Sequence, residues 1–223
     1  MSMTLQEAEF EQGMDELYKE FRRQYEDEYV FEQIHNYYKD NPDIPKATLN
    51  YYHEAQSHFS QEYYTTAFLL TTISIEVGIK VIILKPILFS LAFDKTAGEL
   101  LYDSTFKRKS VPEIPNLYYQ ILQDIAGFDF KNYVRVGETK TLWEELKKIQ
   151  KLRNEVIHQA KNVSPKDALQ TISIARSIHE EVIPNILDSL HFHIEDERIS
   201  SGTRKDAELL KKFEKDKRKK IGS

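Results

Sequence analysis

Residues 68–93 read FLLTTISIEVGIKVIILKPILFSLAF, and the expected fold is organised around this segment. It is apolar nearly all round, which is typical of a helix that its neighbours cover on several sides. Its length would span a bilayer, but three charged residues and a proline interrupt it, which favours a buried core helix. We therefore expect a central helix over 60–93 with a kink at the proline. The interrupting residues are Glu76, Lys80, Lys85 and Pro86.

Amphipathic segments on both sides of this central helix predict an all-α bundle. Polar, proline-containing connections at 94–115 and 127–140 interrupt the helical pattern. Ser164 and Pro165 form an N-cap and first-turn pair that starts the last helix, and Pro184 is expected to bend it. The expected helices cover 3–38, 46–59, 60–93, 116–126, 141–162 and 164–198.

The composition agrees with a helical protein of the cytoplasm. Of 223 residues, 40% are hydrophobic and 30% are charged, and glycine and proline occur only seven times each. That profile is typical of a soluble, mostly helical chain. The absence of cysteine excludes disulfides and thiolate metal sites, and the acidic start MSMTLQEAEFEQ differs from a secretory or transit peptide. We expect a cytoplasmic location and no membrane partner.

The two ends of the chain carry opposite charge. Residues 1–40 hold eleven acidic and four basic residues, whereas residues 198–223 hold ten basic and four acidic residues. The basic end can bind a phosphate backbone, but such ends also occur as solvated tails without a ligand. We divide the chain into an N-terminal helical extension (1–45), a helical bundle (46–198) and a basic C-terminal tail (199–223).

The segment KLRNEVIHQA, residues 151–160, contains an arrangement that amphipathic packing does not explain. On a helical wheel, Arg153 falls near the middle of the apolar arc formed by seven residues of 142–160. A guanidinium there needs a carboxylate, a phosphate or a route to water. Glu76 is the best internal carboxylate, and Lys80, one turn further on, competes for it. Asn154 and His158 lie one turn apart on the opposite, polar side.

These residues resemble the signature of the HEPN domains, which are all-helical bundles of prokaryotic defence and toxin systems and of some eukaryotic ribonucleases. The signature is Arg, usually a polar residue such as Asn, and then His after four to six intervening positions; RNEVIH (153–158) is similar to its shortest form. AQSHFSQEYYTTAFLLTTISIEVGIK (55–80) resembles the first and second helices of the family. SPKDALQTISIARSIHEEVIPNI (164–186) resembles its closing helix. The resemblance covers roughly residues 46–198.

The resemblance implies metal-independent cleavage of RNA, in which a ribose 2′-OH attacks the neighbouring phosphorus. An imidazole has a reference pKa of about 6.5, so His158 is suited to act as base or acid. Arg153 can donate two parallel hydrogen bonds to phosphate oxygens, Asn154 can orient the histidine or the substrate, and Glu76 is expected to support Arg153. Neither a metal nor a cofactor is implied.

One histidine cannot easily serve as base and acid in a single step, and family members dimerise, so a homodimer with two copies of Arg153 and His158 in one cleft is expected. The resemblance further implies a toxin or anti-phage effector, with an antitoxin or another defence protein as a further partner. The alternative is a non-catalytic helical interaction module or scaffold subunit that docks through its N-terminal helix.

Other patterns are weaker. In HFHIEDE (191–197), helical spacing would point the alternate side chains about 200° apart, which makes a poor metal site. Three isolated histidines are expected to be solvated or to cap helices, and the many tyrosines fit packing positions. No glycine-rich phosphate loop or nucleophile elbow is present. The isolated histidines are His53, His58 and His179.

Overall fold

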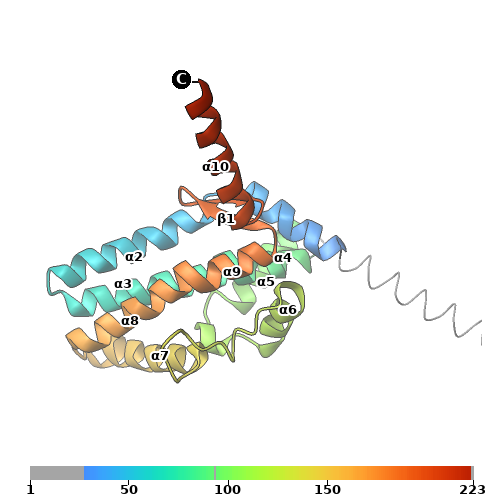
Figure 1. Cartoon of the computed structure of the whole chain (residues 1–223). Coiled ribbons are helices and arrows are strands. Elements are labelled where there is room, and N and C mark those ends of the chain that lie inside the picture. The colour runs from blue at the N-terminus through green and yellow to red at the C-terminus, as the bar shows by residue number, and fades with distance from the viewer. Residues whose placement is uncertain (1–27, 93, 222–223) are drawn as a thin grey trace, which may run out of the picture.

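The computed structural model describes residues 28–92 and 94–221 (Figure 1). This part is mostly helical, which confirms the predicted all-α fold. After a helix over residues 28–40, the elements are α2 (Ile44–Ser60), α3 (Tyr64–Val77), η1 (Gly78–Leu84), α4 (Lys85–Ser90), α5 (Lys95–Thr105), η2 (Val111–Glu113), α6 (Asn116–Ala126), α7 (Leu142–Gln159), α8 (Pro165–Ser177), η3 (Ile178–Val182), α9 (Ile183–Ser189), β1 (Phe192–Glu195), β2 (Arg198–Ser201) and α10 (Arg204–Ile221).

The central helix forms as predicted and runs from α3 through η1 into α4. Tyr64–Ser90 is long and apolar enough to cross a membrane, but most of it is buried inside the protein, as in the core helix of a soluble protein. Pro86 has no N–H to donate to the carbonyl of Ile82, and the Tyr38 hydroxyl donates to that carbonyl at 2.7 Å. The π-helical segment η1 ends just before the proline, where the sequence predicted a kink.

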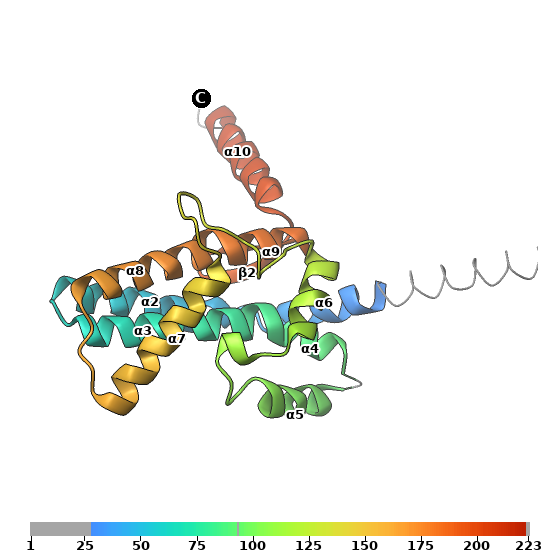
Figure 2. The ribbon, with the colours of Figure 1, turned by 90° about the horizontal axis from the view of Figure 1, so that it is seen from below.

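The last long helix is built in the same way from α8, η3 and α9. The Ser164 hydroxyl accepts a hydrogen bond from the backbone N–H of Asp167 at 3.1 Å, and Pro165 is the first helical residue, as the sequence predicted. A second π-helical segment, η3, precedes Pro184. Figures 1 and 2 show α2, α3 and α8 running side by side, with α3 in contact with both others.

The predicted end of this helix at Arg198 was wrong. The helix stops at Ser189, and β1 pairs with β2 as an antiparallel hairpin. Asp196 and Glu197 at its turn have φ values of 49° and 61°, which suit a tight two-residue turn. Phe192 and His193 of β1 are both buried, whereas Ile194 and Glu195 are half-buried. Successive side chains of a strand point to opposite faces, a two-residue period that a helical wheel misreads.

The two ends of the described chain differ in how they pack. The helix over residues 28–40 joins the core, where Ile34 and Tyr38 are 0% and 1% exposed. The remainder of the helix predicted over 3–38 lies outside the described residues. The segment expected as a charged tail, 199–223, begins in β2 and continues as α10, which projects away from the bundle (Figure 1).

The expected connection at 94–115 was wrong in part because it contains the helix α5. Asp94 caps this helix by accepting a hydrogen bond from the N–H of Ala97 at 2.9 Å. The connection at 127–140 forms as expected and leads into α7, with Gly127 in the left-handed conformation that ends α6. This second connection carries Arg135 into the core, as described below.

Candidate functional site

The candidate site lies on α7, whose start and end are both well defined. Thr141 and Glu144 form a capping box, in which the Thr141 hydroxyl accepts from the Glu144 N–H at 3.2 Å and Glu144 accepts from the Thr141 N–H at 3.0 Å. The helix ends at Gln159, and Ala160 follows with φ of 51° in the left-handed region. Residues 153–158 therefore occupy the last turns of this helix.

The buried face of α7 is narrower than the helical wheel predicted. Leu146, Ile149 and Val156 are buried, but Ile157, which was expected inside the same arc, is 48% exposed. Figure 2 shows α7 crossing α3 at an angle, with the end that carries the motif extending beyond the edge of the bundle. Arg153 is consequently half-buried, at the border of the packed face, and has a route to water.

The carboxylate expected to pair with Arg153 has another partner. Glu76 lies 3.6 Å from the Nζ of Lys80, one turn along the central helix. Within residues 28–92 and 94–212, the Arg153 guanidinium makes no hydrogen bond or ion pair with a side chain. Of the three ways expected to stabilise this guanidinium, an internal carboxylate is thus not used, and water or a bound phosphate remain.

Asn154 and His158 both lie on the exposed side of α7, one turn apart as expected. The Asn154 Oδ1 accepts a hydrogen bond from Gln150 Nε2 at 3.3 Å, which orients the amide along the helix. The imidazole of His158 is solvent-exposed in the described part of the chain. The motif therefore presents a half-buried cation and an accessible imidazole near one end of the helix.

The surroundings of the motif are basic. Residues 147–161 contain five Lys and Arg and a single Glu. That glutamate, Glu155, is paired with Lys161 at 2.6 Å, and this hydrogen bond lowers the pKa of Glu155. The end of α7 thus has an excess of positive charge, which favours phosphate groups as ligands.

Sequence reasoning missed the best-partnered arginine of the described chain. Arg135 donates from Nε to Glu145 Oε2 at 2.7 Å and from Nη2 to Glu145 Oε1 at 2.6 Å, and both residues are 4% exposed. The hydrogen bonds to Glu145 raise the pKa of Arg135. The available signal was Glu145 itself, which falls within the apolar arc of α7 between Leu142 and Ile149. This pair ties the 127–140 connection to α7.

The expectation that His179 is solvated or capping was also wrong. His179 lies on η3, and its ring is buried against α3. His179 Nε2 lies 2.8 Å from the Ser74 Oγ, and the Ser74 hydroxyl donates to the carbonyl of Thr48 at 2.7 Å. Burial away from water lowers the pKa of His179 to about 4. Because the Ser74 proton goes to Thr48, the serine accepts from Nε2, so His179 is a neutral structural group.

The HFHIEDE segment forms no metal site in the described residues, where no group of three or more suitable ligands occurs. On the strand β1, His193 and Glu195 do share a face, and His193 Nε2 lies 3.7 Å from Glu195 Oε2. His193 Nδ1 lies 2.9 Å from the Gly202 carbonyl. These contacts stabilise the hairpin and the start of α10.

No family model, no curated protein and no solved structure matches this chain.

Proposed function

We propose that this protein is a metal-independent endoribonuclease of the HEPN type that acts as a homodimer. The observation that carries the proposal is the state of the motif on α7. Arg153 is half-buried without a carboxylate partner among the described residues, and His158 is exposed at the end of the same helix. An arginine held this way is available to a phosphate, because no carboxylate among the described residues competes for it.

The proposed reaction needs three groups. One imidazole accepts the proton of the ribose 2′-OH as its oxygen forms the new bond to phosphorus. A second imidazole donates a proton to the leaving 5′-oxygen as the old bond breaks, which yields a 2′,3′-cyclic phosphate and a 5′-OH. Arg153 offsets the negative charge that develops on the phosphorane, and Asn154 orients the histidine or the substrate.

The need for two imidazoles explains the proposed dimer. One protomer places only His158 on this helix end, so a twofold contact between two α7 helices would supply the second base or acid. Exposed Ile157 lies between the Arg153 and His158 positions and adds apolar surface to such a contact. Variants that replace Ile157 with aspartate are expected to be monomeric and inactive, which light scattering and RNA cleavage would measure together.

We further propose a cytoplasmic toxin or anti-phage effector, with an antitoxin or defence protein as a further partner. This role follows from the resemblance of 153–158 to the HEPN signature. The competing proposal is a non-catalytic interaction module with the same bundle. Catalysis on RNA separates these two functions.

The deciding experiment is incubation of the purified full-length protein with cellular RNA in EDTA. We expect the wild type to leave 2′,3′-cyclic phosphate ends and His158→Ala to leave RNA intact. His53→Ala removes an exposed histidine on α2 and is expected to cut like the wild type. Equal degradation by the wild type and His158→Ala would indicate a contaminating nuclease, and no degradation by any of the three would favour the interaction module.

A further inference from the structure

The only tryptophan of the chain, Trp143, lies at the first turn of the helix that carries the motif. Its half-buried ring is held edge-on by Tyr119 at a centroid distance of 5.0 Å. Two ammonium groups face the indole: Lys131 Nζ lies 4.6 Å and Lys147 Nζ lies 5.9 Å from the ring centroid. The indole is therefore rigidly placed, partly open to solvent and flanked by two positive charges.

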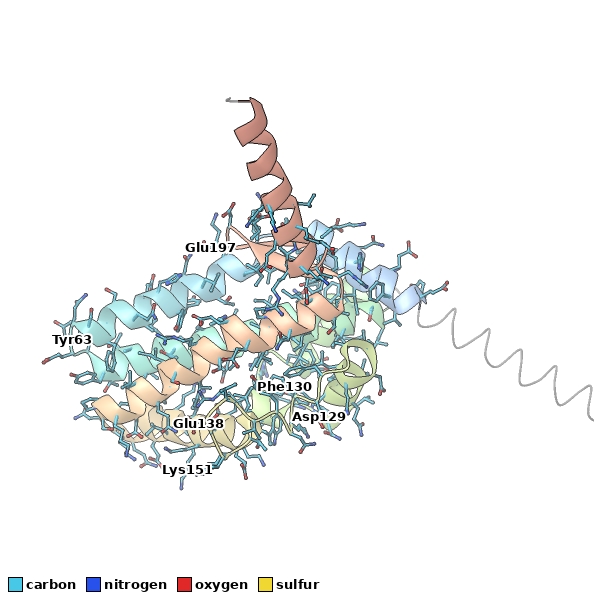
Figure 3. The ribbon with its side chains drawn as sticks, viewed as in Figure 1. Tyr63, Asp129, Phe130, Glu138, Lys151 and Glu197 are labelled. Atoms are coloured by element: carbon cyan, nitrogen blue, oxygen red, sulfur yellow. The ribbon has the colours of Figure 1, made fainter. Side chains whose placement is uncertain are left out.

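One face of α7 connects this cluster to the motif. The side chains of this face project within half a turn of one another, and none of them is acidic. The acidic residues of α7 outside the buried core are engaged elsewhere, since Glu144 closes the capping box and Glu155 binds Lys161. Figure 3 shows Lys151 pointing away from the bundle on this helix. The face consists of Trp143, Lys147, Gln150, Lys151, Asn154 and His158.

We propose that Trp143, Lys131 and Lys147 form a subsite that binds the RNA strand beyond the cleavage position. The inference rests on the proposed ribonuclease function and adds the residues that hold the substrate. One base stacks on the indole, and the two ammonium groups contact the phosphates on either side of it. At 1.5 Å per residue, Trp143 and His158 are about 22 Å apart along the helix, a length of about six stacked nucleotides at 3.4 Å each.

The chemistry of the cluster favours a single-stranded nucleic acid over a duplex. Bases in a duplex are already stacked on their neighbours, whereas an unpaired base exposes a face that an indole can cover. An acidic protein surface could also pair with the two lysines, but such pairing does not require a fixed aromatic ring. The combination of ring and cations therefore points to an unpaired base with its phosphates.

The test uses the fluorescence of Trp143, because the chain has no other tryptophan. We expect a mixed-sequence single-stranded RNA to quench the emission of full-length His158→Ala protein, and the same sequence as a duplex to do so far more weakly. The double variant Lys131→Gln/Lys147→Gln is expected to bind the single strand about tenfold more weakly. Its slope of log K against log salt is expected to fall by about 1.4, the value for two lost phosphate contacts on a single strand.

Matched variants separate this subsite from general charge. Lys39→Gln/Lys46→Gln removes two exposed lysines on the helix over residues 28–40 and on α2, and is expected to bind RNA like its parent. Trp143→Phe keeps an aromatic ring in the packed position and is expected to retain most of the binding without the fluorescence signal. Both controls are read by anisotropy of a labelled RNA, which does not depend on tryptophan.

The outcomes distinguish the two proposals. Cleavage by the wild type with unchanged binding and salt slope in Lys131→Gln/Lys147→Gln would overturn the subsite and leave the ribonuclease proposal standing. Quenching and a reduced slope without any cleavage would support the subsite and refute the ribonuclease. Equal binding of duplex and single strand, or an equal loss in Lys39→Gln/Lys46→Gln, would overturn the subsite as stated here.

Discussion

Arg135 packs against α7 and Arg153 belongs to it, but the surroundings of the two guanidinium groups are opposite. Arg135 is buried and donates two short hydrogen bonds to Glu145, near the start of the helix. Arg153 is half-buried near its end, with no carboxylate partner among the residues described. A guanidinium is therefore part of the packed core at one end of the helix and lies at the border of solvent at the other.

Two histidines repeat the contrast. His179 is buried against Ser74 with a pKa lowered to about 4, so it stays neutral in the core. His158 is exposed on α7. In each pair, one residue has internal partners and stabilises the fold, whereas the other has no such partner among the described residues. The difference between the members of each pair can be measured.

The largest effect is expected at the buried ion pair. Glu145→Ala leaves the Arg135 charge buried without its partner, which is expected to lower the free energy of unfolding by about 3–5 kcal/mol. Glu155→Ala, on the same helix, removes a solvent-exposed ion pair and is expected to change it far less. Urea denaturation of both variants measures the difference. Equal losses would mean that burial does not distinguish the two ends of α7.

The second effect concerns the open arginine. Arg153→Ala is expected to slow RNA cleavage about 10²- to 10³-fold, because one preorganised donor group to the transition state is lost. Its free energy of unfolding is expected to stay within about 0.5 kcal/mol of the wild type. Arg153→Lys keeps the charge without the bidentate geometry, and its cleavage rate is expected to lie between those of the wild type and Arg153→Ala. A large loss of stability in Arg153→Ala would contradict the contrast with Arg135.

The third effect is a pH dependence of stability from the buried histidine. The pKa of His179 is about 4 in the folded chain and about 6.5 in the unfolded chain. Between these values the unfolded chain binds a proton that the folded chain does not, so stability falls as the pH falls. The expected loss from above pH 6.5 to pH 4 is about 3 kcal/mol.

The replacement His179→Gln is expected to remove this part of the pH dependence, whereas His158→Gln retains His179 and is expected to keep it. Urea denaturation over a series of pH values compares the three proteins. An identical slope in His179→Gln and wild type would place the pH dependence at other groups.

The smallest effect is expected where α7 ends. Ala160 has φ of 51°, a left-handed conformation that strains a residue with a Cβ atom. Ala160→Gly relieves this strain, but glycine also increases the conformational entropy of the unfolded chain, which offsets part of the gain. The net effect is expected to raise the free energy of unfolding by about 0.5 kcal/mol. Ala47→Gly, at an exposed helical position in α2, is expected to lower it. If the two variants changed the free energy of unfolding in the same direction, this interpretation would be contradicted.

Most of the helical organisation followed from local patterns. The apolar run at 68–93, the cap formed by Ser164 and the order of the helices were predicted because each depends on residues that are neighbours in sequence. The hairpin 192–201 and the helix α5 were missed. The hairpin strands have four residues each, which is too few to establish a period, and their structure depends on the core against which they pack. The helix α5 is as long as α6, which was predicted, but its only buried residue is Gly98, so it offers no apolar stripe to recognise.

The candidate site was predicted less completely. The position of Arg153 and His158 on one helix follows from their spacing, but the exposure of Ile157 does not, because it depends on where α7 leaves the bundle. The choice of Lys80 as the partner of Glu76 was one of two alternatives that the sequence left open. The burial of His179 depends on Ser74, which is 105 residues away in the chain.

The sequence by itself determined the all-α class, the central apolar helix and the placement of an Arg-Asn and His pair on one helix, because periodicity and capping are local. Only the tertiary structure decided which of two arginines and which of two histidines have internal partners. That choice depends on contacts between segments far apart in the chain, such as Arg135 with Ser177 and His179 with Ser74. Burial arises from these long-range contacts, so a local pattern such as the place of Glu145 in the apolar arc can signal a buried partner but cannot identify it.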